Sequence, residues 1–104
     1  MTEDNFDKYH PQELQQKYEE WCDLHRQQLE AQQQFLKAEA LQNELKEYYL
    51  DPQWMTDREA DLLIEHSGKA HSIFSEDALW SMLSDHDELA RKWMRLGLDA
   101  IDNK

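Results

Sequence analysis

The side chains that could do chemistry are concentrated in one acidic stretch of the chain. Residues 57–88 hold nine carboxylates but only two Lys or Arg side chains, Arg58 and Lys69. Carboxylates at this density attract basic protein surfaces and repel the phosphates of nucleic acids and anionic membranes. We therefore predict that this acidic sector binds a protein partner. Its nine acids are Asp57, Glu59, Asp61, Glu65, Glu76, Asp77, Asp85, Asp87 and Glu88.

The other reactive residues lack the spacing that metal binding or catalysis requires. Cys22 and His25 share one face of a predicted helix, but structural zinc usually takes four Cys or His ligands. Asp61, Glu65 and His66 are close in sequence and add no second cysteine. No phosphate-binding glycine loop, nucleophile elbow or zinc-protease motif occurs. We expect no metal, no cofactor and no catalytic residue, so the protein is predicted not to be an enzyme.

Composition favours long helices. The chain has 104 residues, enough for one domain, and its two glycines and two prolines are too few for the turns of a β-sandwich or barrel. A net charge of −12 with 39% hydrophobic residues leans toward disorder. Four tryptophans, four tyrosines and three phenylalanines can nevertheless anchor a core, and we expect a folded chain.

Charge and cysteine usage indicate the partners and the compartment. The acidic excess predicts that the chain does not bind nucleic acid or membrane directly. It predicts instead a basic protein partner, which could itself be a nucleic-acid-binding protein. The longest apolar runs are three residues, too short to span a membrane. A single cysteine, Cys22, and a polar N-terminus without a signal-peptide pattern predict a cytoplasmic protein.

The first long element is predicted to run from Pro11 to about Tyr49. It is rich in helix formers, and Pro11 suits the first turn of a helix. Apolar residues recur at steps of four and three, which indicates a heptad-like seam. The seam comprises Lys17, Trp21, Leu24, Gln28, Ala31, Phe35, Ala38, Gln42, Leu45 and Tyr49. Residues 1–10 lack this pattern and are predicted to be a flexible polar lead.

Two further helices are predicted after a break at residues 50–52. Asp51 can cap a short helix that begins at Pro52 and runs to about His66, where Gly68 would stop it. Residues 69–74 would connect it to a third helix, from a capping Ser75 to about Ile101. The seam of the third helix is Leu79, Met82, His86, Leu89, Trp93, Leu96 and Ala100, spaced three and four without a slip.

These elements predict an all-α fold of three helices, long–short–long. The two long helices would form an antiparallel, coiled-coil-like hairpin closed by the short helix, and residues 11–104 a single all-helical domain. At about 1.5 Å per residue the first helix is longer than the third by roughly 20 Å. Unless the first helix kinks, that overhang exposes Tyr18, Trp21 and Leu24, a candidate surface for a homodimer.

Two sequence motifs carry a family resemblance. Tyr48-Tyr49 is followed by Trp54 and by Asp57-x-Glu59-Ala60-Asp61, and Ser75-Glu76-Asp77-Ala78-Leu79-Trp80 precedes the third helix. Over about residues 20–100 the chain resembles a bacterial family of small acidic helical domains, domain of unknown function 4298. It departs from that family at Leu62, where a second acid is usual, and it lacks a Lys-Arg-Gly before Ser75. The resemblance implies a small all-helical domain and no particular activity.

Function is predicted from charge and exposure. We expect a non-catalytic interaction module in which the acidic sector speeds encounter with a basic protein and buried aromatic residues provide affinity. One alternative is an inhibitor that mimics DNA or RNA, of a phage or mobile-element type, and occupies the nucleic-acid groove of its target. That role requires acids from two or three helices, since one helix face carries charge too sparsely. The other alternative is a structural homodimer through the first helix.

Overall fold

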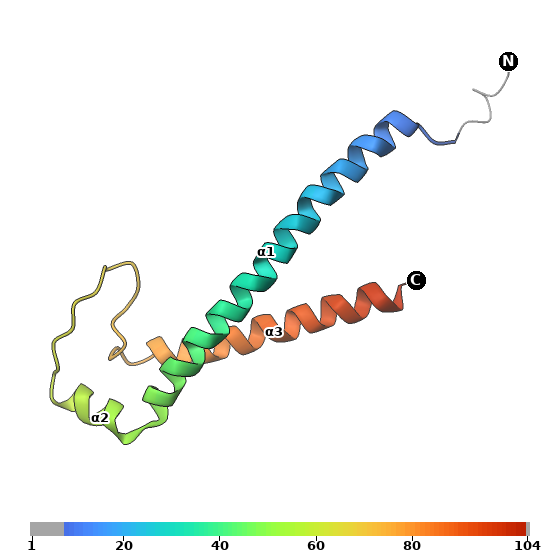
Figure 1. Ribbon diagram of the computed structural model, residues 1–104. Helices are drawn as coiled ribbons and strands as arrows, with labels where there is room; N and C mark the ends of the chain where they lie inside the picture. The colour runs from blue at the N-terminus through green and yellow to red at the C-terminus, as the bar shows by residue number, and fades with distance from the viewer. Residues whose placement is uncertain (1–7, 104) are drawn as a thin grey trace, which may run out of the picture. The chain divides into compact units, whose positions relative to one another are not determined.

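The protein consists of three helices in the order long, short, long. The computed structural model describes residues 8–103, in which α1 spans Pro11–Leu50, α2 spans Pro52–Glu59 and α3 spans Ala78–Asp102 (Figure 1). No strand occurs within these described residues. The predicted all-α, long–short–long fold is confirmed. The antiparallel pairing of the two long helices stays a prediction.

The contacts within the chain divide it into two units, residues 1–37 and 38–104. The described part of the first unit consists of residues 8–10 and the α1 residues up to Lys37. Most of its side chains are exposed, with Cys22, Ala31 and Phe35 partly buried. The predicted lead at residues 1–10 falls mainly on residues 1–7, which lie outside the described residues. The single domain over residues 11–104 stays a prediction.

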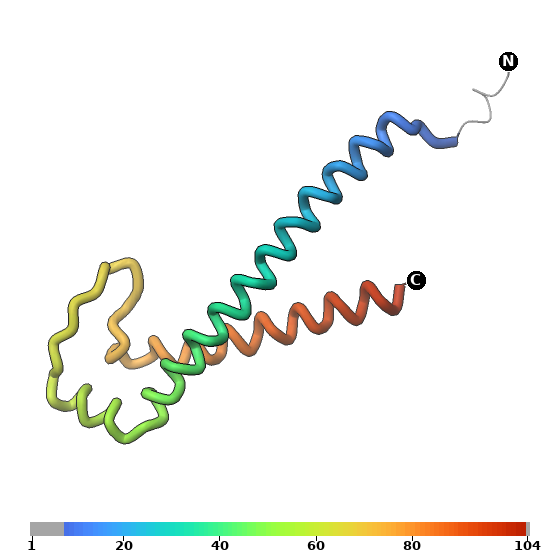
Figure 2. Tube along the Cα trace, in the orientation of Figure 1, coloured from blue at the N-terminus to red at the C-terminus, as the bar shows by residue number. Residues whose placement is uncertain are grey.

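The second unit contains the end of α1, all of α2 and α3, and the loop that joins them. The start of α2 follows the prediction: the Asp51 side chain accepts a 2.9 Å hydrogen bond from the Gln53 amide, and Pro52 occupies the first turn. Figure 2 shows the chain leaving α2 and returning to the beginning of α3.

The predicted extension of α2 to His66 is wrong, because the helix ends at Glu59. Asp61 adopts a left-handed conformation with φ 53°, and its amide donates to the Arg58 carbonyl at 3.1 Å. The Leu62 amide donates to the Asp57 carbonyl at 3.2 Å. These two bonds form a Schellman motif, which closes the helix with an aspartate rather than the expected Gly68. Gly68, with φ 81°, lies further along the loop.

The predicted start of α3 at Ser75 is also wrong. The Ser75 hydroxyl donates to the Ser72 carbonyl at 2.7 Å, so it stabilises a turn in the loop instead of capping the helix. The helix begins at Ala78 after Asp77, whose side chain forms no capping hydrogen bond. The connection therefore covers residues 60–77, rather than the predicted 69–74.

The continuity of α3 agrees with the sequence pattern. The helix passes through residues 85–87 without a break and includes Gly97, as predicted. In its first half one side is covered: Leu79 is buried, and Met82, His86 and Ala90 are half-buried. The later seam residues Leu89, Trp93 and Leu96 are more exposed, and all side chains of residues 91–103 are exposed.

The core of the second unit is small. Among the described residues only Trp54, 6% exposed, and Leu79, 4% exposed, are buried hydrophobics. Half-buried side chains on the end of α1, including Leu45, Tyr48 and Tyr49, lie in the same unit. Because this core is small, a few specific polar contacts determine the position of the loop.

Candidate interaction site

Trp54 anchors the loop to α2. Its indole nitrogen donates to the Ile73 carbonyl at 3.0 Å, and its ring meets the ring of Tyr49 edge to face, with centroids 4.9 Å apart. A buried tryptophan needs a hydrogen-bond partner for its N–H, and here the loop backbone provides it. The same side chain therefore joins the end of α1, α2 and the segment that leads into α3.

Arg58, one of the two bases in the acidic sector, is turned toward this core. Its guanidinium lies 5.5 Å from the centroid of the Trp54 ring, and its Nε donates to the Phe74 carbonyl at 3.0 Å. The cation–π contact and the hydrogen bond keep the Arg58 guanidinium at this core. Its positive charge is therefore directed to the core rather than to the neighbouring acids. Arg58 consequently fixes the loop directly before Glu76 and Asp77.

Asp57 is also used within the fold. It accepts a 2.5 Å hydrogen bond from the Tyr48 hydroxyl and a 3.2 Å bond from the Gln53 side chain. The bond to Asp57, helped by desolvation and by the repulsion between two negative charges, raises the pKa of Tyr48 to about 12. Asp57 thus contributes to the α1–α2 junction, a role that the sequence pattern did not indicate.

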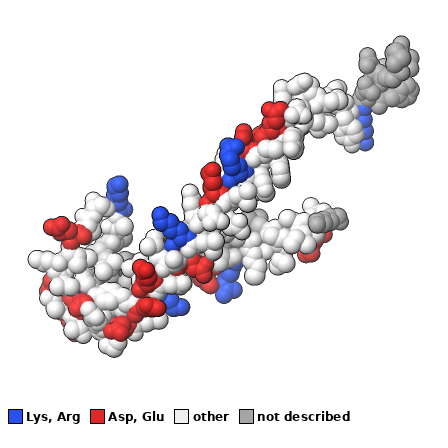
Figure 3. Space-filling view, viewed as in Figure 1, with Lys and Arg blue, Asp and Glu red and all other residues white. Residues whose placement is uncertain are grey.

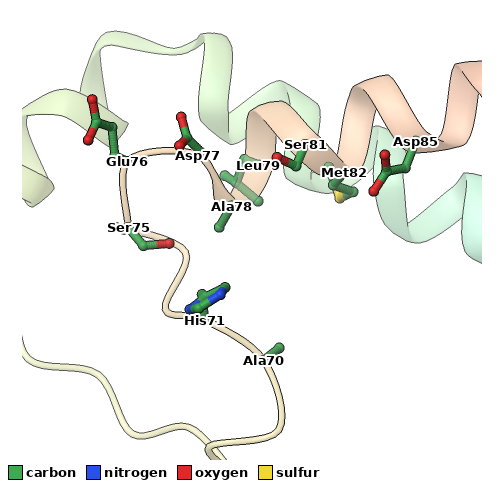
Figure 4. Close-up of a pocket in the computed structure, with 10 residues that line it drawn as sticks. All are labelled: Ala70, His71, Ser75, Glu76, Asp77, Ala78, Leu79, Ser81, Met82 and Asp85. Atoms are coloured by element: carbon green, nitrogen blue, oxygen red, sulfur yellow. The ribbon is translucent and has the colours of Figure 1, made fainter.

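A hollow lies between the loop and the beginning of α3 (Figure 4). It has a volume of about 610 Å³, and Leu79, Met82, Ala70 and Ala78 provide its apolar lining. Its polar lining residues are His71, Ser75, Glu76, Asp77, Ser81 and Asp85, with no Lys or Arg. In Figure 4 the carboxylates of Glu76 and Asp77 extend from the turn on the side opposite His71. We call this feature the α3 hollow.

The structure brings three of the nine predicted acids to the α3 hollow: Glu76, Asp77 and Asp85. All three are exposed, and no ion pair to them occurs within the described residues. Their carboxylates are therefore not engaged by a basic side chain of the described residues. The sequence placed Glu76 and Asp77 inside the third helix, whereas both lie before its first residue, Ala78.

The remaining acids of the sector lie elsewhere. Asp87 accepts from Arg91 at 2.7 Å and Glu88 lies 3.2 Å from Lys92, both as exposed i,i+4 pairs on α3. Such pairs add only a few tenths of a kcal/mol, about 0.3–0.5, to helix stability. Glu59 ends α2, and Asp61 and Glu65 lie in the loop rather than on the predicted helix. None of these five residues lines the α3 hollow.

Acidic character extends beyond the predicted sector. On the face shown in Figure 3, acidic side chains gather over α2 and the end of α1, both in the second unit. The end of α1 carries Glu44 and Glu47, with Asp51 directly after it. These acids lie outside the predicted sector, residues 57–88, although a helix brings residues three and four apart together.

The structure also bears on the metal and membrane predictions. No group of three or more His, Cys, Asp or Glu side chains that could hold a metal ion occurs in the described part of the chain. His25, one of the residues considered for metal binding, stacks on Trp21 with centroids 4.8 Å apart. No helix in residues 8–103 has the length and apolarity needed to cross a bilayer.

Comparison with known proteins identifies a family but no individual relative. A family model with the description "Domain of unknown function (DUF4298)" matches residues 12–96. No curated protein and no solved structure matches the chain. The motif residues Tyr48, Tyr49, Trp54 and Asp57, on which the resemblance was based, are those that join α1, α2 and the loop.

Proposed function

The chain belongs to the family described as Domain of unknown function (DUF4298), and from that premise we propose that it is a non-catalytic interaction module that docks a basic protein partner. The docking surface is the α3 hollow, with Glu76, Asp77 and Asp85 as its charged residues. This assignment refines the sequence prediction by choosing three of the nine acids.

One observation carries the proposal: within the described residues, three exposed acids without an ion pair line the α3 hollow beside Leu79 and Met82, and no Lys or Arg lines it. Lysine and arginine have apolar stems and charged heads, so they match an apolar lining with an acidic rim. A volume of about 610 Å³ accommodates one or two such side chains. The hollow therefore suits the side chains of a basic protein segment.

Long-range charge supports the same partner chemistry. A net charge of −12 attracts a basic protein during encounter, and this attraction weakens as salt is added. The apolar lining from Leu79 and Met82 can bury the stems of the inserted side chains. We expect association to be fast at low ionic strength. The affinity should fall steeply as salt is added, and the apolar contacts should keep some binding at high ionic strength.

The test uses a peptide of alternating arginine and leucine as the probe. Titrated into the isotopically labelled chain at low salt, it should cause saturable amide shifts concentrated in residues 70–85. Replacing the three acids together, Glu76→Gln, Asp77→Asn and Asp85→Asn, should weaken binding by about tenfold, since each exposed ion pair contributes roughly 0.2–1 kcal/mol.

A matched variant separates the hollow from net charge. Glu20→Gln, Glu30→Gln and Glu44→Gln change the charge by the same amount at exposed α1 positions that form no ion pair with another described residue. This control should bind nearly as well as the parent chain. Equal weakening by both triple variants, or shifts spread evenly over all acids, would show that the hollow is not the docking site.

Nucleic-acid mimicry, the sequence-based alternative, requires acids spaced like phosphates on two or three helices. The acids of the α3 hollow come from one turn and one helix, which favours single inserted basic side chains. A competing DNA duplex distinguishes the two roles once a partner has been isolated. The duplex would displace a mimic from a nucleic-acid groove, whereas it would leave a partner docked at another surface in place.

A further inference from the structure

The end of α3 presents a second apolar stripe that the predicted seam does not include. Met94, Leu98 and Ile101 are spaced i, i+4 and i+7, so they lie on one side of the helix. Their exposed fractions are 62%, 53% and 62%. We call these three residues the outer stripe. More than half of each side chain is exposed.

The outer stripe adjoins the seam residues Trp93, Leu96 and Ala100 on the same turns of α3. At about 100° per residue the two sets together span an apolar arc of roughly 200°, whereas a helix packed on one neighbour needs only about 100°. One packed helix can cover the seam or the outer stripe. A single packed helix would therefore leave one of the two sets open, and the outer stripe is available to a second neighbour.

We propose that this second neighbour is the outer stripe of another copy of the same chain, running antiparallel. With the pair centred between Gly97 and Leu98, Met94 of one copy faces Ile101 of the other, and the two Leu98 side chains meet. Three apolar side chains from each copy then become covered. This surface lies outside the α3 hollow, so the proposal is independent of the docking function.

Charge along the flank of the stripe identifies the occupant and its direction. Arg91 and Arg95 flank one end of the outer stripe, and Asp102 flanks the other end on the same side of the helix. In an antiparallel pair that side meets its own equivalent, so Arg95 of each copy approaches Asp102 of the other, while Arg91 stays paired with Asp87 of its own helix. In a parallel pair that side would instead meet the opposite flank of the partner helix, so the arginine and Asp102 would not be brought together. The flank is thus complementary to itself only in the antiparallel direction.

The size of the contact sets its strength. Six apolar side chains of this kind bury less than the roughly 1,200 Å² at which stable interfaces begin, so the dimer should be reversible and concentration-dependent. Two chains with a net charge of −12 each also repel one another. Because salt screens that repulsion, self-association should increase with ionic strength, opposite to the docking of a basic partner.

The first experiment measures mass by sedimentation over a range of concentrations at moderate salt. The parent chain should shift from monomer to dimer. Leu98→Gln with Ile101→Gln should remain monomeric, and the control Leu24→Gln with Leu29→Gln, at similarly exposed α1 positions, should dimerise like the parent. Because glutamine is a good helix former, circular dichroism should show unchanged helix content in both variants.

The second experiment uses charge reversal in two separately purified chains. Arg95→Glu places an acid opposite Asp102 of the other copy, and Asp102→Arg places a base opposite its Arg95. Each variant alone should dimerise several-fold more weakly than the parent, since like charges now meet. Their mixture should recover dimers, which a change confined to one helix could not produce.

The third experiment determines direction in a Cys22→Ser background. Oxidation should cross-link Met94→Cys chains with Ile101→Cys chains. Two Met94→Cys chains should not cross-link, because antiparallel packing separates their positions by about 10 Å along the axis. A monomer at all concentrations, loss of dimer in the α1 control, or a Met94→Cys homodimeric cross-link would each overturn the proposal.

Discussion

The Tyr48 hydroxyl at the end of α1 donates a 2.5 Å hydrogen bond to the Asp57 carboxylate on α2. The two residues are nine positions apart, and the turn at Asp51 and Pro52 brings them together. The bond joins an aromatic residue and an acid that both belong to the motif of the family resemblance. It shows that at least one acid of the sector stabilises the fold.

Tyr48 should make stability depend on alkaline pH. Its pKa is raised from 10.0 to about 12, so the folded state holds the proton more tightly than the unfolded state. The resulting stabilisation is complete below pH 10 and is lost as pH rises through about 12. Ultraviolet titration of tyrosinate should show a step at about pH 12 that belongs to Tyr48. Tyr48→Phe should remove that step, and Asp57→Asn should move it to lower pH. An unchanged late step in either variant would contradict the assignment to Tyr48.

Trp54 should contribute strongly to the stability of the second unit. Trp54→Phe removes the 3.0 Å hydrogen bond to the Ile73 carbonyl and reduces the buried volume. We expect a loss of about 1–3 kcal/mol in the free energy of unfolding, measured with urea. The control is Trp80→Phe, because Trp80 is 62% exposed and should change stability by less than about 0.5 kcal/mol. Equal effects of the two substitutions would argue against the anchoring role of Trp54.

Asp61 occupies the left-handed position that ends α2, so glycine should be preferred there. Asp61→Gly relieves the backbone strain at φ 53° and should stabilise the protein by a few tenths of a kcal/mol, up to about 1. Asp61→Val should destabilise it, since a β-branched residue is strained at positive φ. Glu65→Gly, at a loop position without positive φ, should give no gain. Thermal unfolding of the three variants should rank Asp61→Gly as the most stable and Asp61→Val as the least stable. A gain in stability for Glu65→Gly alone would contradict the Schellman motif at the end of α2.

The helical content was predictable because it depends on local properties. In α3 the seam residues recur at steps of three and four over nearly six turns, and His86 is the one polar residue among them. Asp51 and Pro52 likewise determine the start of α2 through a side chain and a ring that act on adjacent residues. Where one residue acts on the next few, the sequence alone was sufficient.

The end of α2 was not predictable from the same reasoning. Leu62, Leu63 and Ile64 look like a continued helix, yet they lie in the loop, and all three are exposed. What stops the helix is Asp61 in a left-handed conformation, together with the contacts that Trp54 and Arg58 make with Ile73 and Phe74. Those contacts link residues sixteen and nineteen positions apart, so no local pattern indicates them.

The candidate site was predictable in its chemistry but not in its geometry. Charge counting found all nine acids, yet only tertiary contacts separate Asp57, which is bonded to Tyr48, from Glu76, Asp77 and Asp85 at the hollow. Sequence neighbours such as Asp85 and Asp87 also have different roles, because successive helix positions point in different directions.

The two glycines should respond in opposite directions to alanine, which tests the backbone of the second unit. Gly97 lies within α3, and a methyl group added there meets no atom within 4 Å. Gly97→Ala should therefore stabilise the helix by about 1 kcal/mol, since alanine loses less backbone entropy. Gly68 also has open space but a φ of +81°, so Gly68→Ala should destabilise by a similar amount. Urea unfolding at low chain concentration keeps self-association out of the comparison. If Gly97→Ala were destabilising, a neighbour must approach α3 at that position, and if Gly68→Ala were neutral, the loop would not hold its left-handed turn in solution.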